Sequence, residues 1–138
     1  MTKRVNTDAY MDFVDAVTSK ESNDYIAFNS RCFEIQKGDD GIPINRLITA
    51  ALGMSAESGE FTEVVKKIVF QGKPYTEDNR FHMKRELGDV MWYVAQACMS
   101  LDTTIDEIIE MNVDKLKARY PGGEFDVHYS ENRKDGDV

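Results

Sequence analysis

Residues 47–69 read LITAALGMSAESGEFTEVVKKIV, and the spacing of apolar residues in this stretch decides the fold. Apolar side chains recur every three or four positions, as they do on one face of an α-helix. The apolar arc consists of Leu47, Ala51, Met54, Phe61, Val65, Ile68 and Val69. The pattern predicts a helix over about 45–70, which ends at the Gln-Gly-Lys-Pro sequence of residues 71–74.

The same periodicity extends over most of the chain. It predicts helices over 7–18, 76–101 and 104–119, and a weaker helical turn over 23–35. Residues 36–43 have the composition of a loop, and the tail after residue 125 is polar and expected to be loose. No useful alternation of apolar and polar residues indicates a strand. We therefore expect one all-α domain over 1–138, a bundle of about four helices with short connections.

The charge of the chain excludes two kinds of partner. Its 138 residues include 17 Lys and Arg against 25 Asp and Glu, which leaves a formal net charge of −8. Affinity for nucleic-acid polymers and anionic membranes comes largely from clustered Lys and Arg, and the sequence has no basic stripe. The longest apolar run, Val90–Ala95, is well short of the roughly 20 residues that span a bilayer. We expect no nucleic-acid polymer and no membrane as partner.

The cysteines and the first residues indicate a compartment. Cys32 and Cys98 lie far apart and outside any Cys-x-x-Cys spacing, so we expect reduced thiols rather than a disulfide or a metal site. Residues 1–10 include Lys3 and Arg4 with no apolar run behind them, which argues against a signal peptide. These features predict a cytoplasmic protein.

Two of the predicted helices carry carboxylates where apolar side chains are expected. At about 100° per residue, Glu57 projects inside the apolar arc of its helix, and Glu60 lies just beyond the edge. On the next helix Glu86 projects inside the arc, and Asp89 lies just beyond it. That second arc consists of Met83, Leu87, Val90, Met91, Val94, Cys98 and Leu101. The two helices therefore repeat one arrangement of acidic residues.

A glycine occupies the third position of both acidic motifs, at Gly59 and Gly88. Glycine inside a helix costs about 1 kcal/mol relative to alanine. On both helical wheels the glycine falls at the opposite margin of the arc. We expect the missing side chain to let a neighbouring helix approach closely at these positions.

Four converging carboxylates would repel one another, so the arrangement requires a positive group among them. Lys or Arg could supply it through structural ion pairs, and an all-oxygen site also suits Mg²⁺ or Mn²⁺. Zinc and a di-iron centre fit less well, because neither His82 nor His128 lies in a ligand-spaced motif. Another pair, Glu107 and Glu110, points away from its apolar arc and is interpreted as a solvated face.

The acidic motifs resemble those of the MazG-type all-α nucleotide pyrophosphohydrolases. The stretches that carry the resemblance are GMSAESGE at 53–60 and ELGDVMWY at 86–93. The signature of that family is E-x-x-E, a spacer and E-x-x-D, and 25 residues separate the two motifs here. Residues 115–121, KLKARYP, are similar to the K-x-x-x-R ending of those proteins. The resemblance covers about 44–125.

The resemblance implies an enzyme that hydrolyses a (d)NTP between its α and β phosphates, giving a (d)NMP and pyrophosphate. Such an activity would serve nucleotide-pool control or housekeeping. The implied cofactor is Mg²⁺, with Mn²⁺ as a possible substitute. Carried over residue by residue, Glu57, Glu60, Glu86 and Asp89 would be the catalytic metal ligands, and one of them would also orient the attacking water.

The resemblance also implies substrate contacts. Lys115 and Arg119, one helical turn apart, would hold phosphate oxygens, and Asn112 could add a polar contact. Ordinary positive charge at the C-terminal end of a helix is the alternative for Lys115 and Arg119. Tyr93 would stack on or hydrogen-bond the nucleoside sugar, although a partly buried core tyrosine accounts for it equally well. Trp92 points elsewhere on its wheel and is expected to pack at a subunit contact.

A subunit this small is expected to complete its core and site as a homodimer or homotetramer.

Two functions of other classes remain open. A non-catalytic sensor would bind the nucleotide or the metal without turnover. A structural helical adaptor would use Glu57 and Glu86 in ion pairs between subunits. Within the enzyme class the sequence does not choose the base or the sugar, because that choice rests on side chains of the N-terminal region and the loops.

Overall fold

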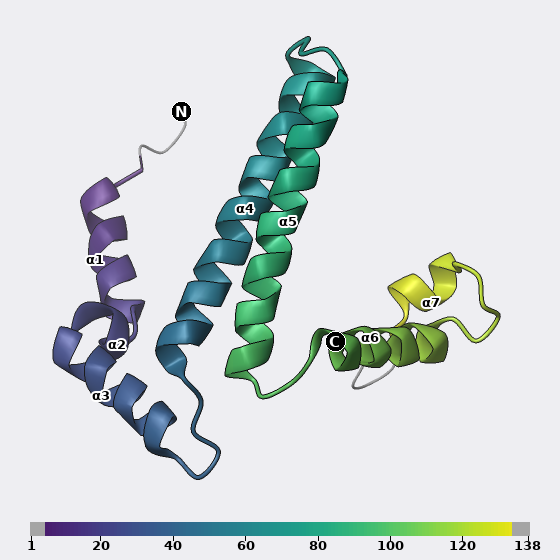
Figure 1. Ribbon diagram of the computed structural model, residues 1–138. Coiled ribbons are helices and arrows are strands. Elements are labelled where there is room, and N and C mark those ends of the chain that lie inside the picture. Colours follow the sequence, from purple (N-terminus) through teal and green to yellow (C-terminus); the bar gives the residue numbers. More distant parts are fainter. Residues whose placement is uncertain (1–4, 134–138) are drawn as a thin grey trace. The chain divides into compact units, whose positions relative to one another are not determined.

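The computed structural model describes residues 5–133, and every regular element within them is a helix. The helices are α1 (Thr7–Val17), α2 (Lys20–Asn23), α3 (Tyr25–Lys37), α4 (Ile44–Phe70), α5 (Glu77–Ser100), α6 (Ile105–Arg119) and α7 (Val127–Glu131) (Figure 1). The prediction of an all-α fold is confirmed. The chain divides into two units, residues 1–44 and residues 45–138.

The first unit contains α1, α2 and α3, and none of the described side chains in these helices is buried. Asn6 caps α1 by accepting the backbone N–H of Ala9. Asp24 caps α3 by accepting two backbone N–H groups, the closer at 2.7 Å. The predicted helix of 7–18 is confirmed by α1. The weaker helical turn predicted over 23–35 is confirmed by α3, whereas α2 before it was not predicted; Asp24 ends α2 and starts α3.

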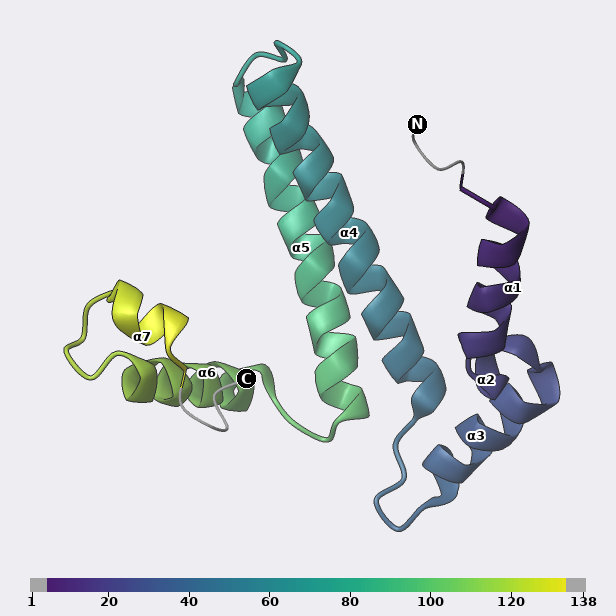
Figure 2. The same cartoon turned by 180° about the vertical axis from the view of Figure 1, so that it is seen from behind.

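The second unit is built on two antiparallel helices, α4 and α5, which lie side by side in opposite views (Figures 1 and 2). Arg46 near the start of α4 donates a hydrogen bond to the sulfur of Met99 near the end of α5, with 2.9 Å between Nη1 and Sδ. The connection between the helices passes through Gly72, whose φ of 69° favours glycine. Thr76 then caps α5 by accepting the backbone N–H of Asn79 (3.3 Å). Both helices therefore end where local signals in the sequence predict.

The last long helix, α6, begins with a capping box. The Thr104 hydroxyl accepts the backbone N–H of Glu107, and the Glu107 carboxylate accepts the backbone N–H of Thr104 (2.9 Å). Glu107 also accepts a hydrogen bond from the Thr103 hydroxyl (2.7 Å), and this bond is the main reason that the pKa of Glu107 is lowered. Glu107 thus acts as a helix cap. This role agrees with the prediction that Glu107 is not part of the acidic site.

The prediction of a loose tail after residue 125 is wrong for residues 127–131, which form α7. Asp126 starts this helix by accepting the backbone N–H of His128 (2.7 Å). Residues 134–138 of the predicted tail lie outside the described residues. No helix within 5–133 combines the length and the apolar character needed to cross a bilayer.

The buried residues of the second unit come from α4 and α5. Among the described residues they are Ala50, Gly53, Val64, Glu86, Cys98 and Ser100. Several members of the predicted apolar arcs are exposed instead: Ala51, Val65, Val69, Leu87, Met91 and Leu101. The prediction that these residues face the core is therefore wrong within one chain. Two helices cover one another along a narrow strip, and the adjoining part of each apolar face stays open.

The glycine that makes a close contact between the two helices is Gly53. A Cβ atom added at Gly53 would overlap the ring of Tyr93, whereas one added at Gly59 or Gly88 would meet nothing within 4 Å. The prediction that Gly59 and Gly88 permit a close approach is thus wrong within one chain, because both face open space. Gly53 instead leaves room for a side chain of α5, the ring of Tyr93.

We predict that Gly53→Ala is less stable than Gly59→Ala by about 1–3 kcal/mol, the usual cost of overpacking a fitted contact. Both variants gain about 1 kcal/mol of helix propensity, so their difference isolates the contact with Tyr93. Urea unfolding followed by circular dichroism measures the two free energies of unfolding. Equal stability of the two variants would contradict the close approach.

Candidate metal centre

Helices α4 and α5 bring three carboxylates together. One ligand oxygen from each of Glu57, Glu60 and Glu86 lies within 4.8 Å of the other two. Glu57 and Glu60 are three residues apart on α4 and therefore share one side of that helix. Glu86 comes from α5. We call these three residues the carboxylate group.

Burial across the carboxylate group is graded. Glu86 is buried, with 7% of its surface exposed, Glu57 is half-buried and Glu60 is exposed. A buried carboxylate is costly unless it is paired or coordinated. The exposed side at Glu60 gives a cation a route from solvent to the buried oxygens.

The fourth predicted ligand, Asp89, lies outside the carboxylate group but beside it. Asp89 lines a hollow together with Glu57, Trp92 and Tyr93. Its negative charge is one of the causes that raise the pKa of Glu57. The structure thus brings three of the four predicted ligands within reach of one cation and places Asp89 next to them.

The pKa of Glu57 is raised above its ordinary value of 4.5. Partial burial is the largest cause, and the negative charges of Glu60, Asp89 and Glu86 add to it. A side-chain hydrogen bond with Glu86 raises the pKa further, since it favours the protonated form of Glu57. Every charged neighbour that shifts this pKa is itself a carboxylate. The site therefore carries negative charge that a divalent cation would neutralise.

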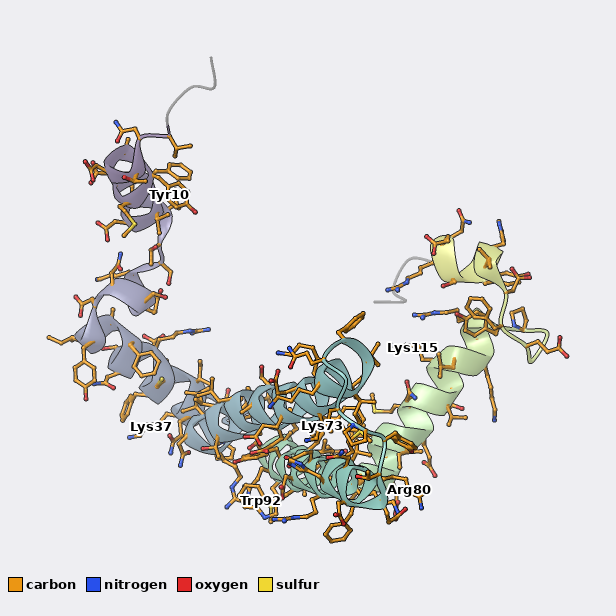
Figure 3. All side chains as sticks on the ribbon, turned by 90° about the horizontal axis from the view of Figure 1, so that it is seen from above. Tyr10, Lys37, Lys73, Arg80, Trp92 and Lys115 are labelled. Carbon is orange, nitrogen blue, oxygen red and sulfur yellow. The ribbon has the colours of Figure 1, made fainter. Side chains whose placement is uncertain are left out.

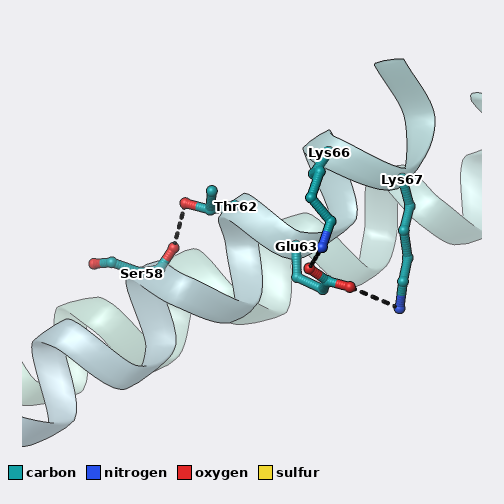
Figure 4. A network of polar contacts seen from close by, with 5 residues as sticks. All are labelled: Ser58, Thr62, Glu63, Lys66 and Lys67. Carbon is teal, nitrogen blue, oxygen red and sulfur yellow. Dashed lines mark hydrogen bonds and ion pairs between the residues drawn. The ribbon is translucent and has the colours of Figure 1, made fainter. Parts of the chain in front are cut away.

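Nearby lysines on α4 are engaged outside the carboxylate group. Lys66 and Lys67 both pair with Glu63, the latter at 3.3 Å (Figure 4). In the same view Thr62 bonds the backbone carbonyl oxygen of Ser58, so this side of α4 is occupied by local contacts. These contacts lend no support to the ion-pair interpretation of the carboxylate group.

The donor set fits a hard divalent cation. Octahedral Mg²⁺ with oxygen ligands at about 2.1 Å places those oxygens roughly 3–4 Å apart, so the carboxylates need only a small adjustment. The three donors are all carboxylate oxygens, which Mg²⁺ and Mn²⁺ prefer. Cys32 and Cys98 are both free thiols and do not belong to the group. The residues present therefore suit Mg²⁺ or Mn²⁺ rather than zinc.

An aromatic pair borders the carboxylates. The rings of Trp92 and Tyr93 meet edge to face, with centroids 4.8 Å apart and planes at 87°. Tyr93 lines the hollow as predicted, and Trp92 lines it as well. Figure 3 shows Trp92 on α5. The prediction that Trp92 points elsewhere is wrong, because the edge-to-face contact keeps the indole beside Tyr93 in the wall of the hollow.

The predicted phosphate contacts lie on another helix. Lys115, Arg119 and Asn112 belong to α6, and Figure 3 labels Lys115 there. The described residues that line the hollow come from α4 and α5. The structure therefore does not bring these three residues into the wall of the hollow.

Sequence reasoning also missed His82. Its Nε2 atom lies 2.8 Å from Oε1 of Glu86. The sequence pattern favours no zinc or di-iron role for His82, because it lies in no ligand-spaced motif. The four-residue spacing from Glu86, which places both on one face of the helix, was the signal that could have found it.

Fold and site together define an all-α protein with a candidate hard-cation site on an antiparallel helix pair. Residues 46–123 match the MazG nucleotide pyrophosphohydrolase domain, and the chain belongs to this family. It is similar to the Gene 37 protein of Mycobacterium phage L5, with 38% identity over 81 residues, which are 58% of this chain and 71% of that protein. No solved structure matches the chain. The family match contains both acidic motifs.

We predict that Glu57→Gln raises the thermal midpoint at about pH 7 in the absence of divalent cations, because it removes one charge from a repelling group. The raised pKa means that the folded state holds this proton more tightly than the unfolded chain does. The favourable contribution of Glu57 is therefore present below pH 4.5 and is lost as the pH rises through the folded-state pKa. The advantage of the variant should accordingly shrink as the pH is lowered.

Differential scanning calorimetry with chelator present measures these midpoints. Glu110→Gln on α6 is the matched control, since it removes the same charge at an exposed position, and should change the midpoint little. A Glu57→Gln midpoint at or below that of the unchanged chain at neutral pH would contradict the repulsion.

Proposed function

We propose that this chain is a divalent-metal-dependent pyrophosphohydrolase that cleaves a (d)NTP between the α and β phosphates. The observation that carries the proposal is the convergence of Glu57, Glu60 and Glu86 within 4.8 Å of one another, inside the residues that match the family. The products are a (d)NMP and pyrophosphate, as suits a role in nucleotide-pool control. Water adds to the α-phosphorus, and the bond to the bridging oxygen breaks so that pyrophosphate leaves.

We assign the metal-binding role to Glu57, Glu60, Glu86 and Asp89, with Mg²⁺ as the cofactor and Mn²⁺ as a substitute. When bound, the cation supplies positive charge to the polyphosphate and to the leaving pyrophosphate. One of the four carboxylates orients the attacking water and takes up its proton. The half-buried Glu57 and the exposed Glu60 leave the substrate a way in from solvent.

The substrate contacts are proposed on two helices. Tyr93, with Trp92 beside it, offers an aromatic surface for the nucleoside next to the carboxylates. Lys115 and Arg119 contact phosphate oxygens, and Asn112 adds a polar contact. Free nucleotides and reduced thiols agree with a cytoplasmic setting, and no nucleic-acid polymer or membrane is proposed as a partner.

We also propose a homodimer or homotetramer. Large apolar side chains on α4 and α5 remain exposed, including Leu52 at 69% and Leu87 at 51%. Contiguous exposed apolar surface marks an interaction site. A second copy of the chain is the partner that fits, because the uncovered strips adjoin the carboxylate group on the same two helices.

The hydrolase proposal predicts that the purified chain with Mg²⁺ releases pyrophosphate from at least one common (d)NTP. Glu60→Gln and Asp89→Asn should each lower the rate on the order of 100-fold or more, because each removes a carboxylate from the metal site. Glu110→Gln is the control and should keep the rate. Coupled pyrophosphate detection across the ribo- and deoxyribonucleotides measures the release, with circular dichroism to confirm folding.

If no pyrophosphate is released, binding measurements distinguish the two alternative functions. Binding of a nucleotide or metal without release would favour a non-catalytic sensor. Absence of both release and Mg²⁺ or Mn²⁺ binding would favour a structural adaptor and overturn the proposal.

Self-association predicts the mass of a dimer or tetramer at micromolar concentration in size-exclusion chromatography with light scattering. Leu87→Glu should shift the chain towards monomer, because it places a charge in the uncovered apolar strip. Arg85→Glu, at an exposed polar position of the same helix, is the control and should leave the mass unchanged. A monomer for the unchanged chain would contradict the proposal.

A further inference from the structure

His82, which is not a member of the carboxylate group, makes a polar contact with one of its residues. His82 lies one turn before Glu86 on α5, and its Nε2 atom approaches Oε1 of Glu86 to 2.8 Å. The histidine side chain is 48% exposed, whereas that of Glu86 is 9% exposed. An exposed ring thus reaches inward to a buried carboxylate.

Glu86 has two close polar neighbours. His82 contacts Oε1, and a carboxylate oxygen of Glu57 lies within 4.8 Å of one of Glu86. A neutral imidazole with its hydrogen on Nε2 donates to a carboxylate and accepts nothing from it through that atom. The contact with His82 therefore restrains the rotation of the Glu86 carboxylate, and Oε2 stays outside this contact.

We propose that His82 is a positioning residue that orients Glu86 for a divalent cation; the proposal rests on the function proposed above. His82 does not belong to the group whose oxygens lie within 4.8 Å of one another, so it acts through Glu86 rather than as a ligand. Neighbours that hold a metal ligand in place typically change metal affinity by 10–100-fold when they are removed.

The neighbouring ion pair on the same helix shows what an ordinary surface contact looks like. Arg80 and Glu77 pair at 3.0 Å, and both side chains are largely exposed. Such pairs contribute little, because solvent screens them and both side chains lose freedom. The pair of His82 with Glu86 differs because one partner is buried inside the site.

The test is Mn²⁺ binding by the full chain, measured by titration calorimetry at about pH 8 to limit imidazole protonation. His82→Leu should weaken Mn²⁺ binding by about 10-fold or more, because it removes the donor. His82→Gln keeps an N–H donor near the position of Nε2 and should restore affinity to within about threefold of the unchanged chain. Arg80→Leu is the control for the helix surface and should bind Mn²⁺ unchanged.

The outcomes separate this proposal from the one on which it rests. Unchanged Mn²⁺ affinity in His82→Leu, or equal weakening in His82→Leu and His82→Gln, would overturn the positioning role and leave the hydrolase proposal standing. Failure of the unchanged chain to bind Mn²⁺ would overturn both. The helical circular dichroism of His82→Leu should match that of the unchanged chain, so that a loss of Mn²⁺ affinity does not come from an unfolded variant.

Discussion

The burial of Glu86 beside Glu57 is the constraint on which the second unit depends. Two carboxylates whose oxygens lie within 4.8 Å of one another, with Glu60 and Asp89 next to them, oppose the packing of the helices that carry them. Apolar contacts elsewhere between α4 and α5 must offset this repulsion. A cation bound among the carboxylates would turn the net repulsion into attraction. A cation bound at these residues would therefore couple stability to metal binding.

The contact of Gly53 with Tyr93 links the packing of α4 and α5 to the candidate site. A side chain at position 53 would push the ring of Tyr93 away, and that ring borders the hollow next to Glu57. One glycine thus makes room for an aromatic wall of the hollow. The packing and the site cannot be varied independently here.

Local signals were sufficient to predict the helices but not the face that each one buries. The ends of α4, α5 and α6 follow from periodicity and from caps such as Thr76 and Thr104, which act over three or four residues. Which side of α4 meets α5 depends on a partner distant in sequence. The helical wheel therefore placed Val65 in the apolar arc, although its side chain is exposed. It also predicted a close contact with another helix at Gly59, whereas Gly53 makes that contact. The short α7 was missed because one cap, Asp126, starts it without a periodic apolar pattern.

Glu57 and Glu86 were predictable because a carboxylate inside an apolar arc is costly wherever the arc packs, whatever the exact partner. The positions of His82 and Trp92 beside the carboxylates were not predictable, because they depend on contacts with neighbouring side chains. A histidine four residues before a glutamate is unremarkable until the glutamate is buried, and then it is a hydrogen-bond donor to an otherwise crowded acid. Burial of Glu86 thus turns a common surface spacing into a contact that restrains a carboxylate of the candidate site.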